Sequence, residues 1–421
     1  MSALLLIGAQ VALADGIAEP AIWNLDESTT VVLVEDHRAP LVELRVQVPV
    51  GNWTPWFLDN HGEEAWTLQH YDPDGALRAR IDALAIDLSV YTREQRSVLA
   101  VSCLKRDLSD AMELVEAIFA NTAYDEAELK RLQQGVDIAW EGNQKDPEFR
   151  RNQAAAALMF APGDARLLTT SEPPPVASDL EALASTRDQM IRLPGRIIGF
   201  GGDLTREEVE SLSQGFLPEV GETLEDVEPV LLPLLERPET HVETMDNLTQ
   251  IYFAYLRDGP LWDDEDYVAW RVADHVLGGH FYSRLYVSLR HEGGETYGAY
   301  TTGGASDSPR LYTLSTFTRV DNQQTTQDKL KEVLATFHAQ GITQQELDDA
   351  VGFLEGRALT EVQSPGQVLN DVMWALGNDR PLDETMRVIE VAQQLTVEEV
   401  NAAIERFYDP AQFTMLTVEP Q

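Results

Sequence analysis

The stretch VLGGHFYSRLYVSLRHEGGETYGAY, residues 276–300, joins two glycine pairs through a helical run that ends in an arginine. Gly278 and Gly279 are typical of a helix end followed by a tight turn into a second helix. The periodicity of that second helix places Phe281, Leu285 and Leu289 on its inner face. The stretch therefore predicts two helices that pack against one sheet.

An arginine and a tyrosine flank the second glycine pair. Arg290 closes the second helix, and Tyr297 starts a strand after Gly293 and Gly294. Both side chains could project to one side of the sheet. Spacing alone favours a simpler interpretation, in which Arg290 binds helix-end carbonyl groups and Tyr297 packs as a half-buried strand residue.

Strands and helices alternate on both sides of this stretch. In the first half, STTVVLVED, LVELRVQVPVG and RIIGFGGDL predict strands, and residues 108–160 predict a long helical region. Residues 217–240 are rich in Pro and Glu and predict a linker. The alternation then resumes and ends in the strand FTMLTVE. The sequence thus predicts an α+β fold with two similar domains, 15–216 and 241–421.

Composition limits the classes of partner. The 421 residues carry a net charge of -40, with 71 acidic against 31 basic residues. This excess argues against nucleic acid or an anionic membrane surface as a partner. The acidic excess is consistent either with electrostatic steering of cationic ligands or with adaptation to high salt, and the sequence leaves both open. Cys103 lies in an apolar alternating run and is expected to be a buried structural thiol.

The N-terminus has features of an export signal. Residues 1–14 contain an apolar run and end in Ala12-Leu13-Ala14, a cleavage pattern of the A-x-A type before Asp15. They predict a signal peptide and a periplasmic or otherwise exported protein. The alternative is an ordinary first strand of a cytoplasmic protein. No other stretch has the length of a transmembrane helix.

The stretch HGEEAWTLQH, residues 61–70, offers the residue types of a zinc peptidase site. The inverted zinc motif His-x-x-Glu-His puts two imidazoles on one helix face beside a general base. Counting from His61 places Glu64 correctly, but Ala65 stands where the second ligand is needed. This register leaves too few ligands for a catalytic zinc.

The other register of the same stretch also fails. Counting back from His70 places Trp66 at the first ligand and Gln69 at the general base. A site without its base cannot activate a bound water. We therefore expect no metal in this chain, and interpret both histidines as surface or interfacial imidazoles.

Residues 276–300 resemble the C-terminal domain of the pitrilysin/insulinase family of zinc peptidases, the inverzincins. The family pattern runs Leu-Gly-Gly, Ser-Arg-Leu, Leu-Arg-Glu and Tyr-Gly, and this sequence matches it at 277–279, 283–285, 289–290 and 297–298. His291 replaces the usual Glu. The resemblance implies that Arg290 and Tyr297 contact the substrate backbone and the developing oxyanion at a zinc site held elsewhere. It also implies substrate-binding positions for Gly278, Gly279 and Arg284.

Together, the resemblance and the degenerate motif predict the zinc-less subunit of a heterodimeric metallopeptidase. A homologous partner with an intact His-x-x-Glu-His motif would hold the zinc. The resemblance implies that the two homologous α+β domains form a clam-shell arrangement around a chamber, in which an unfolded peptide lies as an added strand on a sheet edge. The chain would be inactive alone. Two other classes remain open, namely an inactive scaffold of the same fold and a peptide-binding or chaperone-like module.

Overall fold

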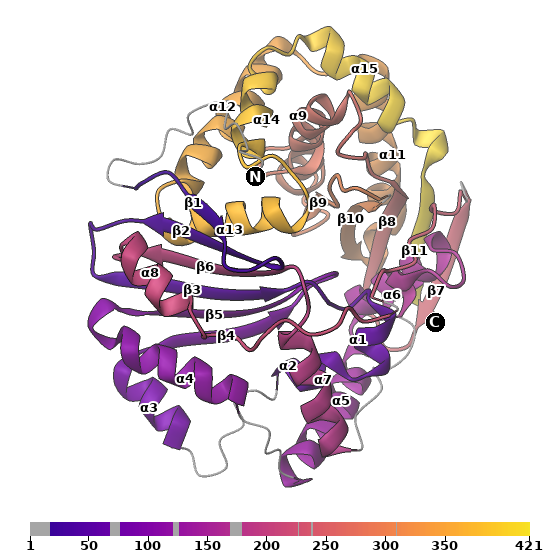
Figure 1. The fold of residues 1–421 in the computed structure, drawn as a ribbon. Coiled ribbons are helices and arrows are strands. Elements are labelled where there is room, and N and C mark those ends of the chain that lie inside the picture. The colour runs from indigo at the N-terminus through magenta and orange to yellow at the C-terminus, as the bar shows by residue number, and fades with distance from the viewer. Residues whose placement is uncertain are drawn as a thin grey trace. The chain divides into compact units, whose positions relative to one another are not determined.

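A computed structural model describes residues 17–67, 76–120, 126–168, 179–225, 227–236, 239–308 and 310–421. The chain forms two compact units (Figure 1). Unit 1 comprises the described residues within 1–137, 173–229 and 357–386, and unit 2 those within 138–172, 230–356 and 387–421. Each unit therefore includes a segment from both halves of the sequence. The predicted signal peptide, residues 1–14, lies outside the described part of the chain. The predicted bounds of the two domains stay a prediction.

Unit 1 is an α+β unit around one mixed sheet. Its strands are β1 (Ala21–Asn24), β2 (Thr29–Glu35), β3 (Leu41–Val48), β4 (Asp87–Thr92), β5 (Ser97–Leu104) and β6 (Arg196–Gly202). Its helices are α1 (Pro55–Asp59), α2 (Gly62–Thr67), α3 (Ala76–Leu84), α4 (Leu108–Ala120), α7 (Leu180–Ile191), α8 (Arg206–Ser213) and α13 (Pro365–Gly377). Three further helices have residues in both units, because a unit boundary falls within each of them: α5 (Glu126–Asn143), α12 (Gln344–Glu361) and α14 (Glu384–Ala392).

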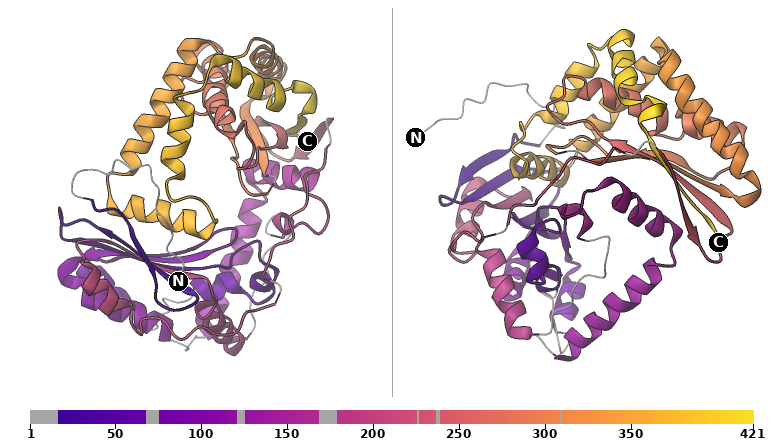
Figure 2. Two further views of the ribbon diagram at one scale, coloured as in Figure 1. Left: turned by 45° about the horizontal axis from the view of Figure 1, so that its top comes forward. Right: turned by 90° about the vertical axis from the view of Figure 1, so that its right-hand side faces the viewer.

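Both faces of the unit 1 sheet are covered. The strand order is β1-β2-β6-β3-β5-β4, and β2 and β6 run parallel. Val31 and Leu33 of β2 face one apolar core, whereas Val32 and Val34 pack with α13 in another. This double burial explains the continuous apolar run of β2, which a one-sided strand would not need. Figure 2 shows α13 across the sheet, and Gly199 of β6 lets the helix approach closely.

Unit 2 repeats this organisation. Its strands are β7 (Thr240–Met245), β8 (Gln250–Asp258), β9 (Ala299–Thr302), β10 (Leu311–Arg319) and β11 (Thr414–Pro420). Its helices are α6 (Pro147–Met159), α9 (Tyr267–Gly278), α10 (Arg284–Tyr286), the π-helix η4 (Val287–Glu292), α11 (Gln323–Gln340) and α15 (Val397–Phe407).

The two sheets share one topology. In unit 2 the order is β7-β11-β8-β10-β9, with β7 and β11 parallel and the other pairs antiparallel. Strands β7, β11, β8, β10 and β9 thus correspond to β2, β6, β3, β5 and β4. One face of β8 packs on α9, α11 and α15, and the other face, through Ala254 and Leu256, packs on α6. The predicted α+β fold with two similar sheets is confirmed.

The structure corrects several predicted elements. Within the predicted helical region 108–160, α5 ends at Asn143 and α6 begins at Pro147, because Asp146 caps α6 and Pro147 occupies its first turn, where proline is tolerated. The short strands β4 and β7 were not predicted, since neither has a clear apolar period. Cys103 lies buried in β5 as expected, and burial raises the pKa of its thiol to about 11. No helix in the described ranges has the length and apolar character to cross a bilayer.

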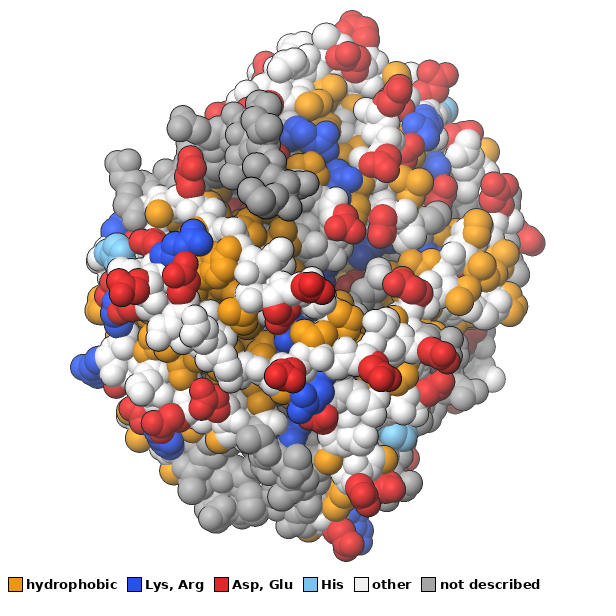
Figure 3. All heavy atoms as spheres, viewed as in Figure 1, with side chains coloured by type: hydrophobic (Ala, Val, Ile, Leu, Met, Phe, Trp, Pro, Cys, Tyr) orange, Lys and Arg blue, Asp and Glu red, His pale blue; other side chains and the backbone are white. Residues whose placement is uncertain are grey.

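Acidic side chains are spread over the surface. On the face shown in Figure 3 they occur throughout and do not gather in one patch. A dispersed excess of this kind keeps a protein solvated and repels polyanions.

Candidate functional site

The end of α9 lies directly against the edge strand β9 in unit 2. A Cβ atom at Gly278 would lie 2.5 Å from Thr301 Cγ2 and 2.9 Å from the Thr301 nitrogen. A Cβ atom at Gly279 would lie 2.8 Å from the Cα of His275. The Gly279 N–H closes the helix by donating to the carbonyls of Asp274 and His275. Packing therefore requires both glycines, and their predicted role in substrate binding stays a prediction.

A short helix and a π-helical turn lead from these glycines to Arg290. The Ser283 side chain caps α10, which continues directly into η4. Leu285 and Leu289 are fully buried and fix this segment to the core. The π-helix has a wider turn than an α-helix, is rare, and is frequently found at functional sites. Here it keeps Leu289 inside while Arg290 reaches the surface.

The structure brings Arg290 and Tyr297 together. The guanidinium lies over the Tyr297 ring, with 4.5 Å between its Cζ atom and the ring centroid. Arg290 also donates to the carbonyl of Thr296 over 3.2 Å. Tyr297 lies just before β9 and is 74% exposed, so the alternative of a half-buried strand tyrosine is wrong. The two side chains form a cation–π pair in which Tyr297 is exposed and Arg290 is partly buried.

Arg284 is engaged within unit 2. Its guanidinium forms two hydrogen bonds with Glu346, of 2.7 and 2.8 Å, and one with the carbonyl of Gly341. It also lies over the ring of Phe337. These contacts fasten α10 to the turn between α11 and α12. They account for Arg284 structurally, and its predicted contact with substrate stays a prediction.

Four aromatic rings that contact one another lie on both sides of Arg290 in the sequence. Phe281 is 70% exposed and Tyr282 75% exposed. The predicted inward position of Phe281 is therefore wrong, because the helix starts only at Arg284 and Phe281 precedes it. Tyr282 and Tyr286 each contact His291 edge to face, next to Arg290. We call Phe281, Tyr282, Tyr286 and His291 the aromatic group.

A second set of stacked rings could not be predicted from the sequence. His275 stacks on His280 with ring centroids 4.2 Å apart, and on Phe353 of α12 with centroids 4.3 Å apart. Burial lowers the pKa of His280 and so favours its neutral form. The turn at Gly279 brings His280 back over His275, but nothing in the sequence near Gly279 indicates the contribution from Phe353.

The degenerate zinc stretch forms part of the unit 1 core. Ala65 and Trp66 of α2 are fully buried, and the indole N–H of Trp66 donates to the carbonyl of Val98. Glu64 is 6% exposed, and burial raises its pKa. His61 has a left-handed backbone with φ of 58° at the start of this helix. The ligand positions 65 and 66 of the two registers thus hold apolar core side chains.

The remaining residues of that prediction, Gln69 and His70, lie outside the described residues. Among the residues that are described, no group of three or more His, Cys, Asp and Glu side chains could hold a metal ion. The residues present therefore do not fit a catalytic zinc, which requires three protein ligands and an open position.

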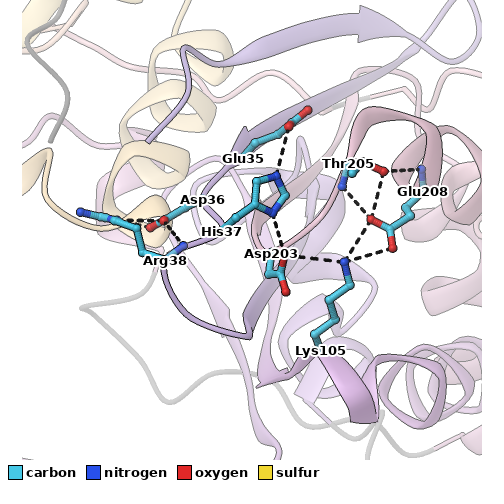
Figure 4. A network of polar contacts seen from close by, with 8 residues as sticks. All are labelled: Glu35, Asp36, His37, Arg38, Lys105, Asp203, Thr205 and Glu208. Carbon is cyan, nitrogen blue, oxygen red and sulfur yellow. Dashed lines mark hydrogen bonds and ion pairs between the residues drawn. The ribbon is translucent and has the colours of Figure 1, made fainter. Parts of the chain in front are cut away.

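A polar network elsewhere in unit 1 has a structural explanation. His37 lies between Glu35 and Asp203, and Lys105 lies between Asp203 and Glu208 (Figure 4). The hydrogen bond to Asp203 raises the pKa of His37. Alternating charges of this kind link the ends of β2, β5 and β6 to the first turn of α8. They balance one another and form no concentrated site of one sign.

Comparisons with known proteins agree with this geometry. A family model described as "Peptidase M16 inactive domain" matches residues 179–354, which include Arg290 and Tyr297. The "Uncharacterized zinc protease YmxG" of Bacillus subtilis is 25% identical over 182 residues, which cover 41% of this chain and 43% of that protein. The "Non-peptidase homolog YmxG" of Helicobacter pylori is 28% identical over 141 residues, 34% of this chain and 33% of that protein. These matches support the resemblance of this chain to the pitrilysin family, as a zinc-less homologue.

Other relatives of the family show how far the similarity extends. Bovine "Cytochrome b-c1 complex subunit 1, mitochondrial" is 22% identical over 212 residues, 49% of this chain and 43% of that protein. The matched segments thus span less than half of each of these curated relatives. A solved M16 inactive domain from Pseudomonas fluorescens has the same fold, with a TM-score of 0.84, 19% identity and coverage of 96% of this chain and 98% of that one. The periplasmic protease PqqL of Escherichia coli, with a TM-score of 0.75 and 15% identity, is covered over 46% of its length by 98% of this chain.

Proposed function

We propose that this chain is the non-metal subunit of a two-subunit zinc metallopeptidase, in which Arg290 and Tyr297 act on a bound peptide. One observation carries the proposal: the two side chains are already in contact, with Tyr297 exposed and Arg290 partly exposed, whereas Ala65 and Trp66 of the zinc-motif stretch are buried in the core. The family resemblance supports the same division of roles.

Arg290 is suited to hold a peptide carbonyl. Its contact with Thr296 uses one of five N–H donors, and within the described part of the chain Arg290 forms no ion pair. The stacking on Tyr297 fixes the plane of the guanidinium before a ligand arrives. A cation held in place in this way loses less side-chain entropy when it binds. Arg290 therefore binds the backbone of the peptide and orients it.

Tyr297 is suited to stabilise developing charge. Its phenol O–H can donate to an oxygen that becomes negative when a peptide carbonyl is attacked. A donor aimed at that oxygen gains strength only as charge builds, and so it acts on the transition state. The neighbouring guanidinium adds a positive charge beside the same region.

A partner subunit supplies what this chain lacks in the proposal. It is a homologue with an intact His-x-x-Glu-His motif, and it holds the zinc. PqqL supports such pairing, because this chain corresponds in fold to about half of that protein. The substrate is an unfolded peptide that adds as a strand to a sheet edge. We place the complex outside the cytoplasm, on the apolar run and the Ala12-Leu13-Ala14 pattern before Asp15.

The test is a matched pair of tyrosine variants in the co-expressed complex. The partner is sought as a neighbouring reading frame of similar length that carries the zinc motif. Tyr297→Phe removes only the O–H and is expected to lower kcat by about 100-fold with little change in KM. Tyr300→Phe, in the adjacent strand β9, serves as the control and is expected to leave kcat unchanged. Equal activity of both variants in an intact complex would remove the catalytic role.

An inactive scaffold is the second candidate. It is supported by the similarity to a subunit of the mitochondrial cytochrome b-c1 complex and to a protein described as a non-peptidase homologue. A scaffold tolerates replacement of Arg290 and Tyr297 without loss of its assembly. A peptide-binding module acting alone would instead bind unfolded peptides without any partner, which titration of the purified chain with labelled peptides detects.

A further inference from the structure

The backbone on both sides of Tyr297 is fixed by side-chain hydroxyls. Thr318 of β10 donates to the carbonyl of Glu295 over 2.8 Å, and Thr316 donates to the carbonyl of Gly298 over 2.8 Å. The Thr296 hydroxyl accepts from the Gly298 N–H over 3.1 Å. An exposed ring thus stands on a backbone segment that is attached to the sheet at both ends.

An ion pair between Glu295 and Lys329 also holds this backbone segment. Lys329 of α11 lies 2.7 Å from Glu295 Oε1, and the Glu295 side chain is only 9% exposed. A side chain at Gly293 would overlap both groups, so the glycine turn folds over the ion pair. The Glu295 N–H donates to the carbonyl of Leu289 over 3.0 Å, which ties the turn back to η4. Because α11 packs in the core of unit 2, Lys329 connects the turn to a rigid element.

We propose that Glu295 and Lys329 are positioning residues that hold Tyr297 and Arg290 in register with each other. The catalytic effect of this positioning rests on the proposed function, whereas the contacts of Glu295 and Lys329 do not depend on it. Arg290 binds the carbonyl of Thr296, which lies between Glu295 and Tyr297. Any movement of Glu295 therefore displaces the carbonyl that orients the guanidinium and the ring that lies beneath it. Pairs of this kind lose function steeply when misplaced by about 1 Å.

The first test uses the chain alone. Lys329→Met removes the cation, and Glu295→Gln keeps the shape of the carboxyl without its charge. Both are expected to raise hydrogen exchange of the Glu295 and Gly298 amides by about 5- to 10-fold. Lys331→Met, an exposed lysine of the same helix, is the matched control and is expected to leave this exchange unchanged. Unchanged exchange in both Lys329→Met and Glu295→Gln would overturn the proposal.

The second test uses peptide cleavage by the assembled complex. Lys329→Met is expected to lower kcat/KM by about 10- to 100-fold, and Lys329→Arg, which retains the cation, to restore most of it. Tyr297→Phe is measured alongside. If Tyr297→Phe lowers kcat and Lys329→Met does not, the positioning role is wrong and the proposed function stands. If neither has an effect, the proposed function fails and the positioning role falls with it.

Discussion

Gly278→Ala tests whether packing, and not substrate binding, accounts for this glycine. The new Cβ would lie 2.5 Å from Thr301 Cγ2 and 2.9 Å from the Thr301 nitrogen. A rotamer change can move the first atom, but the second belongs to the backbone of β9, so the strand or the helix must shift. Overpacking of this kind costs about 1 to 3 kcal/mol. Alanine regains up to about 1 kcal/mol of helix propensity, so the net loss should be roughly 1 to 2 kcal/mol.

Gly352→Ala is the matched control, because it lies in α12 of the same unit and a Cβ there meets nothing within 4 Å. It should raise stability by about 0.5 to 1 kcal/mol. Thermal unfolding measured by circular dichroism should place the midpoint of Gly278→Ala about 3 to 6 °C below that of the parent. A midpoint for Gly278→Ala at or above the parent value would show that β9 does not constrain this position.

Three further predictions concern charge, metal and processing. Burial raises the pKa of Asp274 to about 6, so ionising this carboxyl in the folded chain lowers the free energy of unfolding. The contribution of the protonated carboxyl to stability is full below about pH 4 and is lost as the pH rises to about 6. Asp274→Asn should remove that decline and gain up to about 3 kcal/mol over the parent at pH 7. Parallel denaturation curves from pH 4 to 8 would contradict this. Metal analysis of the purified chain should show less than stoichiometric zinc, and a chelator should leave its unfolding midpoint unchanged; one tightly held zinc per chain would refute the reasoning. N-terminal sequencing of native protein should begin near Asp15, and retention of residues 1–14 would exclude cleavage.

Most of the fold could be predicted because burial leaves clear patterns. The runs in β2 and β8 are apolar at successive positions, which is typical of strands covered on both faces. The helices that cover the second faces, α13 and α6, were harder to place. Each packs on a sheet formed mostly by the other half of the sequence, and periodicity identifies a helix without identifying the sheet it covers.

The sequence allowed a contact between Arg290 and Tyr297 to be predicted, but not the residues around that contact. The spacing of Arg290 and Tyr297 allowed them to meet, and they do. The contributions of Lys329 and Phe353 come from helices distant in the sequence, and no local motif marks them. The exposure of Phe281 was also missed, because the apolar period of 281, 285 and 289 suggested one helix where the helix starts at Arg284. Periodicity is least reliable at the ends of elements.

Exposure separates the contribution of Tyr297 to folding from its proposed contribution to catalysis. A ring that is 74% exposed gains little from burial, and a cation–π contact at an exposed site contributes about 0.5 to 1 kcal/mol. Replacing Tyr297 with Phe retains even that contact, so unfolding cannot explain a 100-fold loss of kcat, which corresponds to about 2.7 kcal/mol. Trp66 is the opposite case, because it is fully buried and its loss would cost about 3 to 5 kcal/mol of stability. Folding thus accounts for Trp66 in the zinc-motif stretch, whereas it does not account for the exposed ring of Tyr297 beside Arg290.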